Sequence, residues 1–167
     1  MTRSDSRPLE VPQLDGAHIV MSDMNAEGAD EYVVIENLGT VAQPMTNWVL
    51  TSLRGDQFYT MPEGFVLRAG GRVRIHSGPG AQSSPPNDLL WTRDSIWNNK
   101  GDTAVLFGAN GHEVARIGHG NRRDDSKREK LLYRENGEMR IEDLKPYKKV
   151  NLGWSSPDAD PSPEEAE

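Results

Sequence analysis

Short β-type segments separated by turn residues, several of which alternate apolar and polar residues, constrain the fold of this chain more than any other feature. Eight of them follow one another between residues 17 and 117: AHIVMS, EYVVIENL, NWVLTSL, QFYTM, FVL, GRVRIHS, DTAVLFG and HEVARI. In GRVRIHS, Val73 and Ile75 fall on one side of a strand, while His76 and two arginines fall on the other. A period of two residues is typical of a half-buried β-strand. The chain is therefore predicted to be all-β.

The turn residues indicate how these strands are joined. Asn110-Gly111 lies between the last two segments and is a strong signal for a hairpin, and the chain holds 16 Gly and 11 Pro. No helical pattern intervenes, so we predict two packed antiparallel sheets, an immunoglobulin-like β-sandwich. Gly78 begins a long loop, GPGAQSSPPNDLL, that we expect to cross from one sheet to the other. The expected core residues alternate at strand spacing: Tyr32, Val34, Trp48, Leu50, Phe65, Leu67, Val73, Ile75, Leu90, Trp97, Val105 and Phe107.

Composition excludes several classes of protein. The chain has no cysteine, which excludes disulfides, thiolate nucleophiles and cysteine-based zinc sites. The first residues do not resemble a signal peptide, and no apolar run approaches the length of a membrane helix. The expected location is therefore the cytoplasm. The net charge of −7 makes non-specific nucleic-acid binding unfavourable.

The ends of the chain differ from its middle. Residues 1–15 are polar and aperiodic and are expected to form a disordered leader, with the sandwich spanning 16–120. Residues 121–152 form a charged segment with a second Asn-Gly turn, Asn136-Gly137, and are expected to add a β-hairpin on or beside the sandwich. Residues 153–167 form a disordered acidic tail, and Trp154 at its start could be a core anchor or a partner-facing side chain.

The stretch SDMNAEGADEYVVIEN, residues 22–37, tests for a calcium site. Counted from Asp23, the positions of an EF-hand loop are matched by Asn25, Glu27 and Gly28. The twelfth position is Val34, which has no carboxylate, and the flanking segments are strands. Another cation site could use Asp23, Asn25, Asp30 or Glu31, but acidic turns are common. We interpret the stretch as a turn that leads into a strand.

The β region resembles a known family. EYVVIENLG followed by NWVLTS is similar to the first strands of the lamin tail domain, the immunoglobulin-like module of nuclear lamins and of many prokaryotic proteins. YTMPEGFVLRAGGRVRIHSG and SSPPNDLLWTRDSIWNNKGDTAVLFGANGHEVA resemble its later strands, loops and final hairpin, so the resemblance covers about residues 18–118. It implies a non-enzymatic interaction module. The chain departs from nuclear lamins in having no heptad run for a coiled-coil rod.

Candidate catalytic and metal-binding residues are few. The four histidines, His18, His76, His112 and His119, are scattered and form no metal-binding pair on a helix. Ser77 beside His76 lacks the glycine pattern of a nucleophile elbow, and Arg54-Gly55-Asp56 is explained by a hairpin turn. Acids from Asp88 to Asp102, including Asp94, could form an acid/base site, which leaves a small hydrolase as the weakest alternative.

We therefore predict a non-catalytic protein-binding or scaffolding module of the lamin tail domain type. No catalytic, cofactor-binding or metal-binding residue is assigned. We expect the protein to bind no cofactor, no membrane and no small-molecule substrate. Strand addition at an open sheet edge is the favoured binding mode. The main alternative is a nucleic-acid-associated adaptor that uses the basic segment 121–150, where 10 basic and 7 acidic residues are interleaved.

Overall fold

The computed structural model describes residues 9–55 and 57–121, which form ten strands and no helix. None of the described residues therefore belongs to a helix that could cross a membrane. In chain order the strands are β1 (Ile19–Asn25), β2 (Glu31–Asn37), β3 (Gln43–Pro44), β4 (Val49–Ser52), β5 (Gln57–Thr60), β6 (Val66–Leu67), β7 (Arg72–Ser77), β8 (Asp88–Thr92), β9 (Gly101–Phe107) and β10 (Glu113–Gly120).

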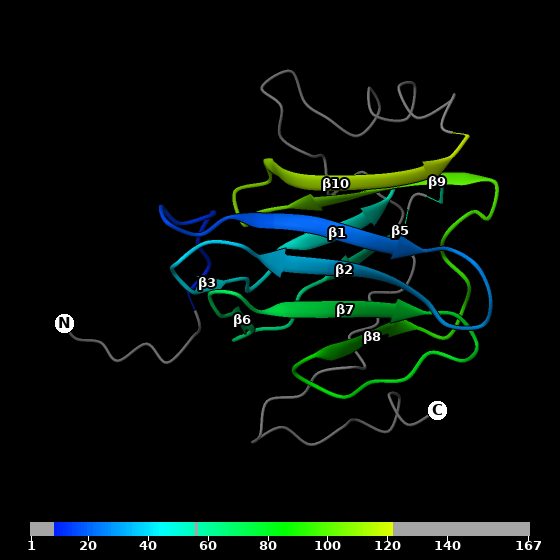
Figure 1. The fold of residues 1–167 in the computed structure, drawn as a ribbon, viewed down its shortest axis with the longest axis horizontal. Helices are drawn as coiled ribbons and strands as arrows, with labels where there is room; N and C mark the ends of the chain where they lie inside the picture. Colours follow the sequence, from blue (N-terminus) through cyan, green and yellow to red (C-terminus); the bar gives the residue numbers. More distant parts are fainter. Residues whose placement is uncertain (1–8, 56, 122–167) are drawn as a thin grey trace.

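The strands form two four-stranded sheets and one small pair. One sheet has the order β1-β2-β7-β8, which we call the front sheet, and the other has the order β10-β9-β4-β5, which we call the back sheet. β3 pairs with β6. Figure 1 shows the front sheet facing the viewer with β9 and β5 behind it, and β10 lying alongside β1. The predicted immunoglobulin-like β-sandwich is confirmed.

Two predicted hairpins are present. β4 pairs with β5 across the turn that contains Arg54 and Gly55, and β9 pairs with β10 across residues 108–112. In the second turn the N–H of Gly111 donates to the carbonyl of Gly108, and the N–H of Gly108 donates to that of His112. Gly111 has a φ of 82°, a conformation that side-chain-bearing residues rarely adopt.

The core lies between the inner faces of the two sheets. Predicted core residues that belong to it are Trp48, Leu50, Phe65, Leu67, Val73, Ile75 and Trp97. Trp91 packs edge-on against Trp97 with ring centroids 5.7 Å apart, an arrangement that adds to the stabilisation from burial alone.

Five expected core residues lie outside this main cluster. In β2 the inward residues are Val33 and Ile35, whereas Tyr32 and Val34 alternate with them. Leu90 alternates in the same way with Leu89 and Trp91 of β8, and Val105 and Phe107 belong to a separate cluster. Val34, Leu90, Val105 and Phe107 are nevertheless buried as predicted, because these strands carry apolar side chains on both faces, and only Tyr32 is half-buried.

The loop from Gly78 to Asn87 does not cross between the sheets as expected. It joins β7 to β8, which are parallel neighbours in the front sheet. Because a parallel connection must return to the starting end of the sheet, the loop runs back along β8. Ser84 forms a single antiparallel bridge with Asp88 on this path.

Part of the predicted disordered leader contacts the sandwich. The indole N–H of Trp48 donates to the carbonyl of Val11 at 2.9 Å, and Gln43 donates to the carbonyl of Pro12 at 3.1 Å. The N–H of Leu14 donates to the side-chain oxygen of Gln43 at 2.7 Å. The attached chain therefore begins before residue 16, while residues 1–8 lie outside the described part.

Candidate functional site

The acidic stretch that resembled half of a calcium loop is a hairpin turn between β1 and β2. The side chain of Asn25 donates to the carbonyls of Glu27 at 3.1 Å and Asp30 at 2.9 Å, and thereby closes the turn. Asp23 lies within β1, opposite Val34, and its carboxylate accepts from the N–H of Met24 at 2.8 Å. In the described part of the chain no three His, Asp or Glu side chains gather as metal ligands. The interpretation as a turn is confirmed.

Glu31, another residue considered for a cation site, points into the protein instead. It is 2% exposed, and its Oε1 accepts from the hydroxyl of Ser77 and from the N–H of Ile96, both at 2.8 Å. The carboxylate thus ties β2 to β7 and to the loop before β9. Its role in the structure is to satisfy buried donors.

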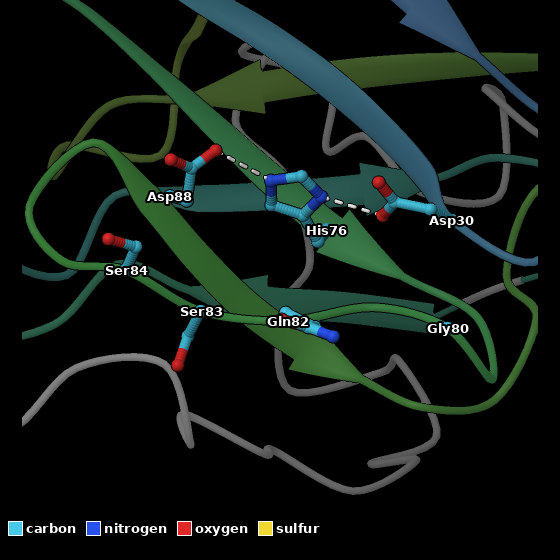
Figure 2. Close-up of a pocket in the computed structure, with 7 residues that line it drawn as sticks. All are labelled: Asp30, His76, Gly80, Gln82, Ser83, Ser84 and Asp88. Atoms are coloured by element: carbon cyan, nitrogen blue, oxygen red, sulfur yellow. Dashed lines mark hydrogen bonds and ion pairs between the residues drawn. The ribbon is translucent and has the colours of Figure 1, made fainter.

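A polar site that opens to the surface surrounds His76. This residue lies on the outer face of β7, as the alternation in GRVRIHS predicted, but its side chain is only 8% exposed. Its Nδ1 lies 2.7 Å from Oδ1 of Asp30, and its Nε2 lies 2.8 Å from Oδ1 of Asp88. Figure 2 shows the two carboxylates on opposite sides of the ring. Both nitrogens can donate at once only in the imidazolium form.

A pocket of about 360 Å³ opens beside this ring. Besides Asp30, His76 and Asp88 it is lined by Gly80, Gln82, Ser83 and Ser84 of the loop between β7 and β8 (Figure 2). The loop residues are therefore the outer wall of the pocket, and β7 and β8 are its floor.

The hydrogen bonds of His76 decide what this pocket can do chemically. A serine hydrolase needs a histidine nitrogen that accepts the proton of the nucleophile. Each ring nitrogen of His76 already faces a carboxylate, so neither is available to Ser83 or Ser84. Ser77 is directed inward to Glu31. The site is an Asp-His-Asp bridge that holds the β1–β2 turn against β7 and β8.

The acids proposed for a hydrolase lie apart from one another. Asp88 lines the pocket, Asp94 is exposed, and Asp102 is fully buried at the start of β9. The carboxylate of Asp102 accepts from the hydroxyl of Ser52 at 2.9 Å and from three backbone N–H groups, those of Arg54, Asn98 and Thr103. Burial raises the pKa of Asp102, and these hydrogen bonds oppose the rise. A carboxylate saturated by backbone donors is typical of a structural clamp.

The edges of the two sheets differ in how far they are covered. β1 and β10 lie alongside each other, and the start of β8 is bridged by Ser84. β5 is the outer strand of the back sheet, and among the described residues no strand pairs with its second edge. The N–H of Met61 donates to the carbonyl of Trp48 at 2.7 Å, so by antiparallel alternation the N–H and C=O groups of Phe58 and Thr60 point away from β4. Sequence reasoning did not identify this edge, because it depends on the strand order.

The two packed four-stranded sheets define an immunoglobulin-like module. The sequence matches the lamin tail domain family over residues 13–121, and the chain belongs to that family. It is similar to human lamin-B2, with 30% identity over 102 residues. The match covers 58% of this chain but only 16% of lamin-B2.

Proposed function

We propose that this chain is a non-catalytic protein-binding module that receives a partner strand at the open edge of β5. The observation that carries the proposal is the outer edge of β5, with which no described strand pairs and where Phe58 and Thr60 present main-chain groups away from β4. Strand addition uses such groups for affinity and alternate side-chain pockets for specificity. Membership in the lamin tail domain family supports the same class of function.

The chemistry of the polar sites supports the non-catalytic part of the proposal. Both nitrogens of His76 face carboxylates, and the carboxylate of Asp102 is held by four donors. These groups stabilise loops, and neither His76 nor Asp102 is directed at a nucleophile. The proposed place of action is the cytoplasm.

The nucleic-acid alternative rests on residues 121–150, of which only Asn121 is described. No described residue favours it. It is retained as an outcome of the experiment below, because a basic segment would make binding depend on nucleic acid and on salt.

The test compares two variants at one position of β5. Thr60→Pro removes the outward N–H without touching a bond to β4, and Thr60→Val keeps this N–H while removing the hydroxyl group. Full-length wild type and both variants are used to capture partners from native lysate, with and without nuclease. Urea unfolding of each variant checks that the fold is retained.

Strand addition predicts a nuclease-resistant partner that wild type and Thr60→Val retain and Thr60→Pro loses. Equal capture by Thr60→Pro and Thr60→Val would refute the use of this edge. Capture that disappears with nuclease and in high salt would instead favour the nucleic-acid adaptor.

A further inference from the structure

The outer face of the back sheet carries a second apolar cluster, separate from the main core. It consists of Val49, Leu53, Phe58, Val105 and Phe107, which we call the outer cluster. The register places Val49 opposite Phe107 and places Phe58 and Val105 opposite the same residue of β4. Their inward neighbours, including Leu50 and Leu106, belong to the main core. The outer cluster therefore faces away from the front sheet.

These side chains are buried although they face outward. Val105, Phe107 and Leu53 are 0% exposed, and Val49 and Phe58 are 3% and 6% exposed. Phe58 belongs to an edge strand, where an uncovered ring on the outer face would be in contact with water. The described strands pack through the inner faces of the two sheets, and none of them lies over the outer cluster. The cover therefore comes from a segment outside these ten strands.

The chain that follows β10 starts beside this face. The N–H of Asn121 donates to the carbonyl of Lys100 at 2.8 Å, and Arg54 donates to the carbonyl of Asn121 at 2.7 Å. Asn121 is thus fixed where β9 begins and near the turn between β4 and β5. Residues 122–130 in extended form reach about 30 Å, whereas a four-stranded sheet is only about 15–20 Å wide. The following residues can therefore reach any part of the face.

The sequence of residues 130–142 fits such a face. With Asn136-Gly137 as a two-residue turn, Leu132 pairs with Ile141, and both share a face with Met139. Arg134 falls on the same face, and the opposite face carries Leu131 and Tyr133 among charged side chains. A single hairpin is marginally stable by itself, so it requires an apolar surface to pack against.

We propose that residues 130–142 form a hairpin whose face of Leu132, Met139 and Ile141 covers the outer cluster. The apolar surface of the back sheet is then satisfied within the same chain, and the sandwich has a third layer on this side. The inference is independent of the strand-addition proposal, which concerns the edge of β5.

Two adjacent leucines provide a matched test in the full-length chain. Leu132→Asp places a charge on the covering face, and Leu131→Asp places the same charge on the opposite face. Hydroxyl-radical labelling with mass spectrometry measures the exposure of Phe58 and Phe107 in each protein. Near-ultraviolet circular dichroism of the packed core tryptophans reports whether the sandwich stays folded.

The proposal predicts low labelling of both rings in wild type and Leu131→Asp, and a several-fold increase in Leu132→Asp. Equal labelling in the two variants, or strong labelling in wild type, would overturn it. Protection that falls on dilution, together with a dimer in sedimentation, would overturn it in favour of a second copy.

A second measurement needs no substitution. In the wild-type chain, nuclear Overhauser contacts are expected between the methyl groups of Leu132 or Ile141 and the rings of Phe58 or Phe107. Their absence from an otherwise assigned spectrum would contradict the proposal even if Leu132→Asp fails to fold.

Discussion

Replacing Asp102 with alanine tests whether the acids after β8 are structural. The carboxylate is fully buried and accepts four hydrogen bonds, three of them from backbone N–H groups that cannot turn toward water. Each buried donor left without a partner costs about 1–3 kcal/mol. Burial of the carboxylate carries a desolvation cost, which is also why the pKa of Asp102 is raised in the folded protein. Removing the carboxylate removes this cost and so offsets part of the loss. We therefore expect Asp102→Ala to lower the free energy of unfolding by about 3–5 kcal/mol.

The assay is urea unfolding followed by tryptophan fluorescence, with Asp94→Ala as the matched control. Asp94 belongs to the same acidic stretch but is exposed, so its replacement is expected to change stability by less than about 0.5 kcal/mol. A small domain has about 5–15 kcal/mol of stability, which leaves Asp102→Ala measurable. A loss below about 1 kcal/mol at Asp102, or equal losses at both positions, would refute the clamp.

Three further predictions concern the histidine bridge, the titration of Asp102 and one close backbone contact. His76→Ala removes the bridge between Asp30 and Asp88 and is expected to lower the free energy of unfolding by about 1–3 kcal/mol in a urea titration. His18 is exposed, so His18→Ala is the control and should change this free energy by less than about 0.5 kcal/mol. Equal effects of the two substitutions would contradict the bridge. Because the pKa of Asp102 is raised on folding, the proton-linked part of its contribution to stability is complete below the usual value of 3.8 and is lost as pH rises. The free energy of unfolding of wild type relative to that of Asp102→Asn should therefore fall as pH rises above about 4, and a difference that grows with pH would contradict the raised pKa. Gly101→Ala would place a methyl group against the carbonyl oxygen of Asn121 and is expected to lower the free energy of unfolding by about 1–3 kcal/mol. Thermal unfolding measures this loss, and an unchanged transition would contradict the tight packing at this end of β9.

The sequence predicted the sandwich because its strands are short and its turn residues are explicit. The two hairpins with Gly55 and Gly111 were found, since local turn chemistry fixes them. The path of the Gly78–Asn87 loop was not, because its two strands are parallel neighbours and strand order leaves no local signal.

The facing of individual strands was predicted only where one side is polar. Val73 and Ile75 alternate with arginines, and both were placed correctly. The strand EYVVIEN is apolar at three successive positions, so alternation could not decide between Val33 and Val34. The same ambiguity affected β9 because both of its faces are covered by apolar side chains.

The contacts around His76 could not be predicted from the sequence because they join residues that are far apart along the chain. His76 was correctly placed on the outer face of its strand, but its partners lie 46 and 12 residues away in sequence. The signal that could have indicated the bridge is the combination of a histidine on an otherwise arginine-bearing face with acids at Asp30 and Asp88. Only the folded arrangement of β2, β7 and β8 brings these groups together.

The predictions for residues 122–167, which include the second Asn-Gly turn, the acidic tail and Trp154, lie outside the described residues and stay predictions. The proposal for residues 130–142 gives the second turn a specific place to pack, and the leucine pair tests it.

Amide hydrogen exchange along β5 tests the central claim, an open edge that receives a partner strand, most directly. In the free protein, the outward amides of Phe58 and Thr60 should exchange fast, and the amides of Tyr59 and Met61, which face β4, should exchange slowly. Addition of the captured partner should then slow exchange at Phe58 and Thr60. Slow exchange at these two amides in the free protein, or no change when the partner binds, would contradict the account.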